Sequence, residues 1–220
     1  MRRRDTALQK LSTLRVNPIL LDIPEQFETE RLVIRAPRPG DGAEINAAIY
    51  ESFESLALYM PWARERPTPS QSEEYVRRAR AWFIDRTDLA LLLYHKPSGE
   101  FVGGSGLHRP KWDVPRFEIG YWCRKKYEGQ GFISEAVRGI TRFAFETLGA
   151  KRVEIRCDVL NERSRRVAES AGYRLDATLR NNGIRANGDL RDTLVFSLIP
   201  EQFEQAKTAA SAAERREDRS

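Results

Sequence analysis

The chain has 220 residues, of which 40% are hydrophobic and 31% are charged, a composition typical of a soluble globular protein with one substantial core. No apolar run approaches the roughly 20 residues of a membrane-spanning helix, and the basic, polar start does not resemble a secretory signal. The composition therefore excludes a transmembrane protein, predicts no membrane partner and favours a cytoplasmic location. Cys123 and Cys157 lie in apolar, strand-like runs, so we expect reduced thiols.

The net charge of +5 is concentrated at the N-terminus, where the first 15 residues hold five Arg or Lys residues and one Asp. We therefore divide the chain into a basic arm over residues 1–26, a single domain over residues 27–203 and a C-terminal tail over residues 204–220, which lacks an apolar stripe. A basic arm favours contact with nucleic acid or another anionic surface. A solvated terminus without a partner is the alternative.

The domain is predicted to begin with a strand and two helices. Residues 29–36 alternate between apolar and polar side chains, as an edge strand does. Helices are predicted to begin at Asp41 and Ser70, because each stands three residues before a glutamate, in the pattern of a capping box.

Three strands are predicted next, over residues 89–95, 100–108 and 116–123, the first two joined by a tight hairpin. Side chains alternate between the two faces of a strand, so Glu118 shares a face with Trp122. That face therefore carries a carboxylate.

The second half is predicted to contain a long helix that ends near Gly149 and a short helix that Asn161 caps and Gly172 ends. Strands are predicted over residues 152–159, 173–179 and 192–198. The predicted order of elements is β-α-α-β-β-β-α-β-α-β-β.

The run YEGQGFISE, residues 127–135, places Gly129 and Gly131 between a strand and a helix. A helix start leaves backbone N–H groups unpaired and carries partial positive charge, and glycines remove the side chains that would keep a phosphate away. The run therefore predicts an anion-binding cradle, with a loop that binds nothing as the alternative. It is neither a Walker loop nor a dinucleotide fingerprint, which would need a third glycine in place of Ser134.

Residues 118–172, which include this cradle, resemble the GCN5-related N-acetyltransferase (GNAT) superfamily, and within it the Rim-type branch of ribosomal-protein N-terminal acetyltransferases. Four further motifs resemble that branch: ETERLVIR at 28–35, LYMPWA at 58–63, GGSGLH at 103–108 and NGDLRDTLVFSL at 187–198. The resemblance covers residues 27–203. It implies a single α/β (α+β) domain with a mixed, mostly antiparallel central sheet flanked by helices.

The resemblance also implies that acetyl-CoA is the co-substrate and that the cradle binds its pyrophosphate. The family pattern Gln/Arg-x-x-Gly-x-Gly/Ala falls on residues 128–133, where Glu128 and Ile133 depart from it without removing a backbone donor. The predicted cofactor-binding residues are Cys123, Arg124, Glu128, Gly129, Gln130, Gly131, Phe132, Ile133, Ser134 and Asn161. Arg124 and the two lysines after it offer positive charge to the phosphates, or alternatively form a solvated turn. His95 and His108 have no further ligand at suitable spacing, so no metal is expected.

The chemistry requires an amine to attack a thioester and a thiolate to leave. An α-amine with a pKa near 8 is neutral about a tenth of the time at pH 7, so it needs only a modest base. Glu118 is the predicted base, with a structural ion pair as the alternative, and the resemblance makes Ser164 the predicted acid, with a polar helix residue as the alternative. The backbone N–H of Cys123 or a neighbour is expected to bind the oxyanion. Asn161 is expected to contact pantetheine, and Trp62 to line the acceptor site by resemblance, although packing would also explain Trp62.

The sequence therefore predicts an acetyl-CoA-dependent N-acetyltransferase whose acceptor is a protein N-terminus of the ribosomal-protein type, with ribosomal contact through the basic arm. A small-molecule amine, such as a polyamine or an antibiotic, is the alternative acceptor. A non-catalytic protein that binds CoA or nucleic acid is the other alternative. The sequence makes no prediction of the oligomeric state.

Overall fold

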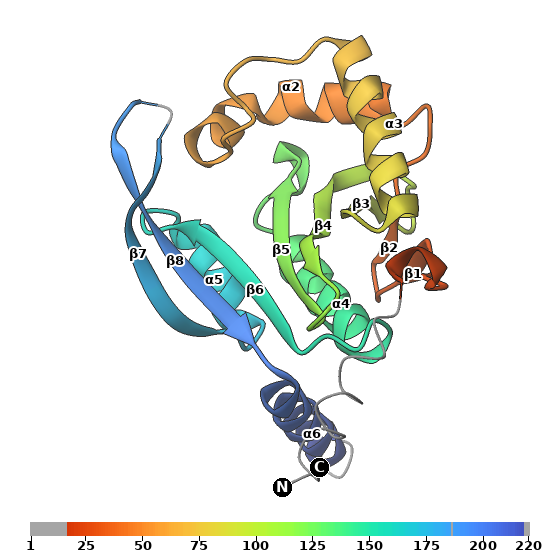
Figure 1. The fold of residues 1–220 in the computed structure, drawn as a ribbon, viewed down its shortest axis with the longest axis vertical. Helices are drawn as coiled ribbons and strands as arrows, with labels where there is room; N and C mark the ends of the chain where they lie inside the picture. Colours follow the sequence, from red (N-terminus) through yellow and green to blue (C-terminus); the bar gives the residue numbers. More distant parts are fainter. Residues whose placement is uncertain (1–16, 186, 218–220) are drawn as a thin grey trace, which may run out of the picture.

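The computed structural model describes residues 17–185 and 187–217, which form a central sheet with helices on both faces (Figure 1). The strands lie in the order β1-β2-β3-β4-β5-β6-β8-β7, and only β5 and β6 pair in parallel. This architecture confirms the predicted fold class. The strands are β1 (Gln26–Glu28), β2 (Leu32–Arg35), β3 (Leu89–His95), β4 (Phe101–Lys111), β5 (Arg116–Cys123), β6 (Arg152–Asp158), β7 (Arg174–Ile184) and β8 (Leu190–Leu198).

The structure describes five helices, of which the first four pack on the sheet and contribute to two clusters of buried side chains, while the last extends from the end of β8 (Figure 1). The helices are α2 (Gly42–Tyr59), α3 (Pro69–Asp85), α4 (Phe132–Glu146), α5 (Glu162–Ser170) and α6 (Pro200–Glu217). The larger cluster contains the buried side of α4, and the smaller cluster packs α2 and α3 against β3 and the start of β4. Two short 3₁₀ turns, η1 (Pro18–Leu20) and η2 (Lys125–Tyr127), complete the described elements. None of the described helices is long and apolar enough to cross a membrane.

The main irregularity of the sheet is a wedge between β5 and β6. Their parallel pairing covers only three residue pairs and ends at Glu118 and Glu154. Beyond that point β5 remains paired to β4 and β6 to β8, while β5 and β6 separate toward α2 (Figure 1). The edges that face the wedge carry backbone donors and acceptors that a buried chain needs to satisfy. The wedge is therefore a natural place for an extended, amide-containing ligand.

Several elements differ in detail from the sequence-based prediction. Of the strand predicted over 29–36, only residues 32–35 form a strand, β2. Strand β1 lies before the predicted range, and the two are separated by a turn in which the Thr29 N–H donates to the Leu32 carbonyl at 2.9 Å. Asp41 does precede α2, but its carboxylate pairs with Arg35 at 2.7 Å and gives no side-chain cap. Residues 200–217, which include most of the predicted tail, form helix α6.

The cap of α3 also differs from the prediction. Thr68 and Gln71 form the capping box, and Pro69 occupies the first turn, a position that suits its fixed φ. Glu73, the predicted partner of Ser70, instead accepts hydrogen bonds from the N–H groups of Gly40 and Gly42. The predicted helix is present, but its start is two residues earlier.

Candidate active site

The glycine cradle forms at the start of α4, as predicted. Gly129 has φ +73° and Gly131, the N-cap residue, has φ +81°, a left-handed conformation that other residues rarely adopt. Among the hydrogen bonds of the described residues, none uses the backbone N–H groups of residues 129–134 as donors. A Cβ built on Gly131 would meet only Arg31, at 3.5 Å, and one built on Gly129 would meet nothing within 4 Å. The cradle therefore offers unpaired donors next to open space, which fits a phosphate.

Arg31 is a cation at the cradle that the sequence-based site did not include. Its guanidinium donates to the Gln130 carbonyl at 3.1 Å, pairs with Glu135 at 2.6 Å and lies 4.3 Å from the centroid of the Phe132 ring. Glu135 also accepts hydrogen bonds from the Arg31 N–H at 2.8 Å and the Thr29 hydroxyl at 2.6 Å. Residue 31 lies in the quoted ETERLVIR motif, but nothing local in the sequence indicates that it reaches a helix 100 residues away.

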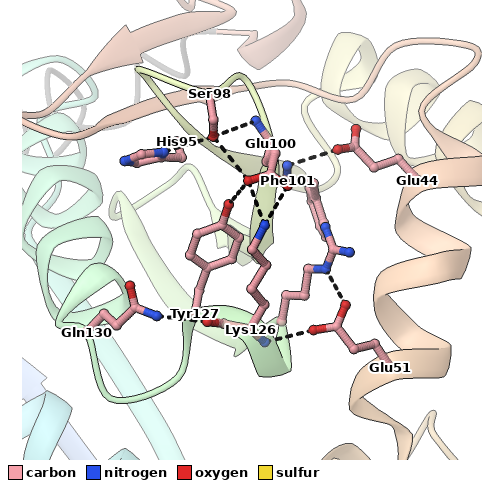
Figure 2. Close-up of polar contacts among 10 residues, drawn as sticks. Glu44, Glu51, His95, Ser98, Glu100, Phe101, Lys126, Tyr127 and Gln130 are labelled. Carbon is pink, nitrogen blue, oxygen red and sulfur yellow. Dashed lines mark hydrogen bonds and ion pairs between the residues drawn. The ribbon is translucent and has the colours of Figure 1, made fainter.

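The basic turn before the cradle is held by carboxylates (Figure 2). Lys126 donates from its side chain to Glu100 at 2.7 Å and from its backbone N–H to Glu51 at 2.8 Å, and Arg124 pairs with the same Glu51 at 2.7 Å. Hydrogen bonds from Lys126 and Tyr127 lower the pKa of Glu100 to about 2. These contacts fix η2 to α2 and to the start of β4, so Arg124 is held in an ion pair rather than in a solvated turn.

Glu128 occupies the first position of the family pattern and connects the cradle to two helices. Its carboxylate pairs with Arg163 at 2.8 Å and Lys125 at 3.3 Å and accepts a hydrogen bond from Ser55 at 3.3 Å. Burial opposes ionisation of Glu128, but the hydrogen bonds from Lys125 and Arg163 outweigh it and lower its pKa. The two cations therefore offset the negative charge that Glu128 brings beside a phosphate site.

Ser164 lies across the wedge from β5, where it meets a second hydroxyl. Its Oγ is 2.9 Å from the Tyr121 hydroxyl oxygen, and Asn161 caps α5 by accepting a hydrogen bond from the Ser164 N–H at 3.0 Å. Burial raises the pKa of Tyr121, so this phenol stays protonated at neutral pH. On β6, burial raises the pKa of the Cys157 thiol. Ser164 and the Asn161 cap were predicted from the sequence, whereas no chemical role was predicted for Tyr121.

Glu118 lies at the base of the wedge, in the last parallel pair of β5 and β6. Its carboxylate is 2.9 Å from Arg109 and 3.6 Å from Arg156. Its position favours the predicted role as a base beside the thioester, whereas its ion pairs favour the structural alternative. On the same face of β5, Trp122 contacts Trp62 edge to face with ring centroids 6.1 Å apart.

The two free cysteines do not form a disulfide. Cys123 ends β5 next to the basic turn, and burial raises the pKa of its thiol to about 12. A thiol with so high a pKa is a poor nucleophile at neutral pH. If Cys123 contributes to the site, its backbone is the part that can act.

A wedge beside a parallel strand pair, with a glycine cradle at the next helix, is an arrangement that fits an extended phosphate-bearing ligand. Comparison with known families gives the class: residues 31–174 match the acetyltransferase (GNAT) domain, and the chain belongs to this family. It is an N-acetyltransferase, as the names of its curated relatives support.

The relatives support the Rim-type branch. The chain is 32% identical over 181 residues to a Bacillus subtilis protein named "Putative ribosomal N-acetyltransferase YdaF", covering 81% of this chain and 96% of the relative. It is 35% identical over 63 residues to the ribosomal-protein-serine acetyltransferase of Escherichia coli, covering 29% of this chain and 35% of the relative.

Solved structures share the fold at lower identity. RimL, an L7/L12 α-N-protein acetyltransferase in complex with coenzyme A, matches with a TM-score of 0.72 at 20% identity, covering 80% of this chain and 97% of RimL. MccE, a microcin C7 self-immunity acetyltransferase in complex with acetyl-CoA and AMP, gives the same TM-score and identity and covers 78% of this chain and 93% of MccE. At this identity, the matches establish the fold alone.

Proposed function

We propose that the protein transfers an acetyl group directly from acetyl-CoA to the α-amine of a protein N-terminus. The observation that carries this proposal is the wedge that leads from Glu118 toward the unpaired N–H groups of the cradle. An extended pantetheine would pair with the strand edges while its pyrophosphate binds the helix start. The relative named as a ribosomal N-acetyltransferase supports a protein acceptor. A cytoplasmic location, where both thiols stay reduced, is part of the proposal.

In this proposal, the neutral amine attacks the thioester carbonyl carbon, the C–S bond breaks and the sulfur leaves with a proton from Ser164. Glu118 accepts the amine proton directly or through a water molecule, and the backbone N–H of Cys123 binds the oxyanion. Most of the acceleration comes from holding the amine and the thioester together, because an α-amine already has an appreciable neutral fraction at pH 7. Cys123 forms no acetyl intermediate.

The proposal is tested by incubating the protein with acetyl-CoA and a panel of acceptors while measuring thiol release and acceptor mass. The panel contains a peptide with a free N-terminus and an internal lysine, the same peptide with a blocked N-terminus, and a polyamine. We expect one added acetyl group on the free peptide and none on the blocked one. Turnover with the polyamine alone would favour the small-molecule alternative. Absence of both turnover and coenzyme A binding in calorimetry would contradict the enzyme mechanism.

A further inference from the structure

A cavity of about 370 Å³ opens between the end of α2 and the tip of the β7–β8 hairpin. Figure 1 shows that the wedge between β5 and β6 opens toward this region. Its α2 side includes Leu58, Met60 and Pro61, and Asp158, the last residue of β6, contributes to its wall. An acceptor in this cavity would approach the wedge from the end of β6.

The cavity is lined by three arginines, Arg64, Arg185 and Arg191, and by one carboxylate, that of Asp158. Asp158 is fully engaged: Arg185 contacts its two oxygens at 2.8 and 3.0 Å, and the Leu160 N–H donates to it at 2.9 Å. Burial disfavours the Asp158 anion, but the hydrogen bonds from Arg185 and Leu160 outweigh this and lower its pKa. Asp158 therefore pairs with Arg185, whose charge Asp189 and Asp192 also offset, and Arg64 and Arg191 line the wall as further cations.

Arg191 is the unusual member of this wall. Its Nε is buried and has no hydrogen-bond partner among the described residues, and the chain places its guanidinium beside Gly183, where an added Cβ would come within 3.2 Å of Nε. A buried donor without a partner costs about 1–3 kcal/mol, and more when the group is charged. Asp192, its neighbour, accepts a hydrogen bond from the Asn181 N–H at 2.8 Å and does not line the cavity. Arg191 therefore lines the cavity without an ion-pair partner within 4.0 Å among the described residues, although its charge also acts on Asp158.

We propose that this cavity binds an anionic group of the acceptor, so that the enzyme prefers N-terminal peptides with Asp or Glu within the first few residues. The inference rests on the proposed function and adds the chemical class of the acceptor. Arg191 and Arg64 supply the charge, and the apolar side of α2 packs against the peptide chain. A carboxylate accepts charge-assisted hydrogen bonds from the guanidinium, whereas an amide of the same shape accepts only weaker, neutral ones. The carboxylate is therefore expected to contribute more binding free energy.

The test compares peptides that share a free N-terminus and differ at the second and third positions as Asp/Asn or Glu/Gln. At low salt we expect kcat/KM to be at least about tenfold higher for the acidic peptides, mainly through KM, and the preference to weaken as salt is added. Arg191→Gln should reduce the acid-to-amide ratio to below about threefold, and Arg191→Lys should retain part of it. Arg180→Gln, an exposed arginine on β7 outside the cavity, is the matched control and should leave the ratio unchanged.

Melting temperature and coenzyme A affinity of each variant establish that it is folded, so that a changed ratio reports on the cavity. Equal rates for acidic and amide peptides, or an undiminished preference in a folded Arg191→Gln variant, would overturn the inference while leaving the proposed function intact. Absence of acetylation of every free N-terminus and of free glutamate would overturn both. A further measurement uses free glutamate as the acceptor, to separate a peptide carboxylate from that of a small molecule. If glutamate is acetylated in an Arg191-dependent way and no peptide is, the cavity does bind an anion but the acceptor is not a peptide.

Discussion

The hydroxyl groups of Ser164 and Tyr121 face each other across the wedge, 2.9 Å apart. A serine alone is a weak acid, but a thiol with a pKa near 8.5 needs only limited protonation to leave. Because burial keeps Tyr121 protonated, its phenol can orient the Ser164 hydroxyl, the acid of the proposed mechanism. The Asn161 cap fixes the backbone of Ser164 at the start of α5, so the helix cap and the proposed catalytic position depend on the same turn.

The cradle makes a prediction at Gly131. In Gly131→Ala, the added methyl group enters the space assigned to phosphate, and we expect coenzyme A affinity to fall more than about tenfold. The φ of +81° also strains an alanine by roughly 1–2 kcal/mol. Gly149→Ala is the matched control, because Gly149 has φ +65° with nothing within 4 Å of its Cβ and lies beyond the far end of α4. Both variants are expected to lose stability, but calorimetry should show weakened coenzyme A binding only for Gly131→Ala. Equal coenzyme A affinities of the two variants would show that the cradle does not bind coenzyme A.

At the scale of elements, the sequence predicts best those strand and helix boundaries that a local pattern of residues determines. Strands β3 and β5 begin and end at the predicted residues, because β3 is a continuous apolar run, β5 alternates between apolar and other side chains, and turn residues lie next to both. The cap of α3 was misplaced because Glu73, which has the right spacing for a capping box, bonds to a neighbouring loop instead. For the same reason Arg31 and Tyr121 were missed as site residues. Their roles depend on partners 104 and 43 residues away, which no local pattern specifies.

The link between the β1–β2 turn and α4 makes a pH-dependent prediction. Burial opposes ionisation of Glu135, but hydrogen bonds from Thr29 and Arg31 outweigh it and lower its pKa. A lowered folded-state pKa stabilises the protein above the unfolded value near 4.3, and this contribution disappears as the pH falls through the folded value. Glu135→Gln should therefore lower the free energy of unfolding by about 1–3 kcal/mol at pH 7, and by less at pH 3.

Urea unfolding at the two pH values measures this difference. The control is Glu146→Gln on the same helix, which removes only an exposed ion pair with Lys207 and should change stability by about 0.5 kcal/mol or less. If Glu135→Gln lowers the free energy of unfolding by the same amount at both pH values, the ionic role of Glu135 is contradicted.

At the scale of the whole molecule, most of the net charge lies in residues 1–16, which are outside the described part of the chain. The described residues that follow are part of the fold. Ile23 is buried, the Leu21 carbonyl accepts a hydrogen bond from Arg86 at 2.8 Å, and Glu25 pairs with Arg80 at 2.6 Å. A functional test of the basic arm should therefore remove residues 2–16 and leave this packed segment in place.

Deleting residues 2–16 removes a net charge of +4 and lowers the formal charge of the chain from +5 to +1. We expect kcat/KM for a free peptide and the affinity for coenzyme A to stay within about twofold, because cradle and wedge lie in the retained fold. Binding to ribosomes at low salt should weaken, since the arm supplies most of the net positive charge. Deletion of residues 2–25 is the contrasting variant and should also lower the melting temperature, because it removes Ile23. Cosedimentation with ribosomes over a salt series measures the ribosome binding of the full chain and of the variant without residues 2–16. Unchanged cosedimentation would indicate that the arm is a solvated terminus without a partner.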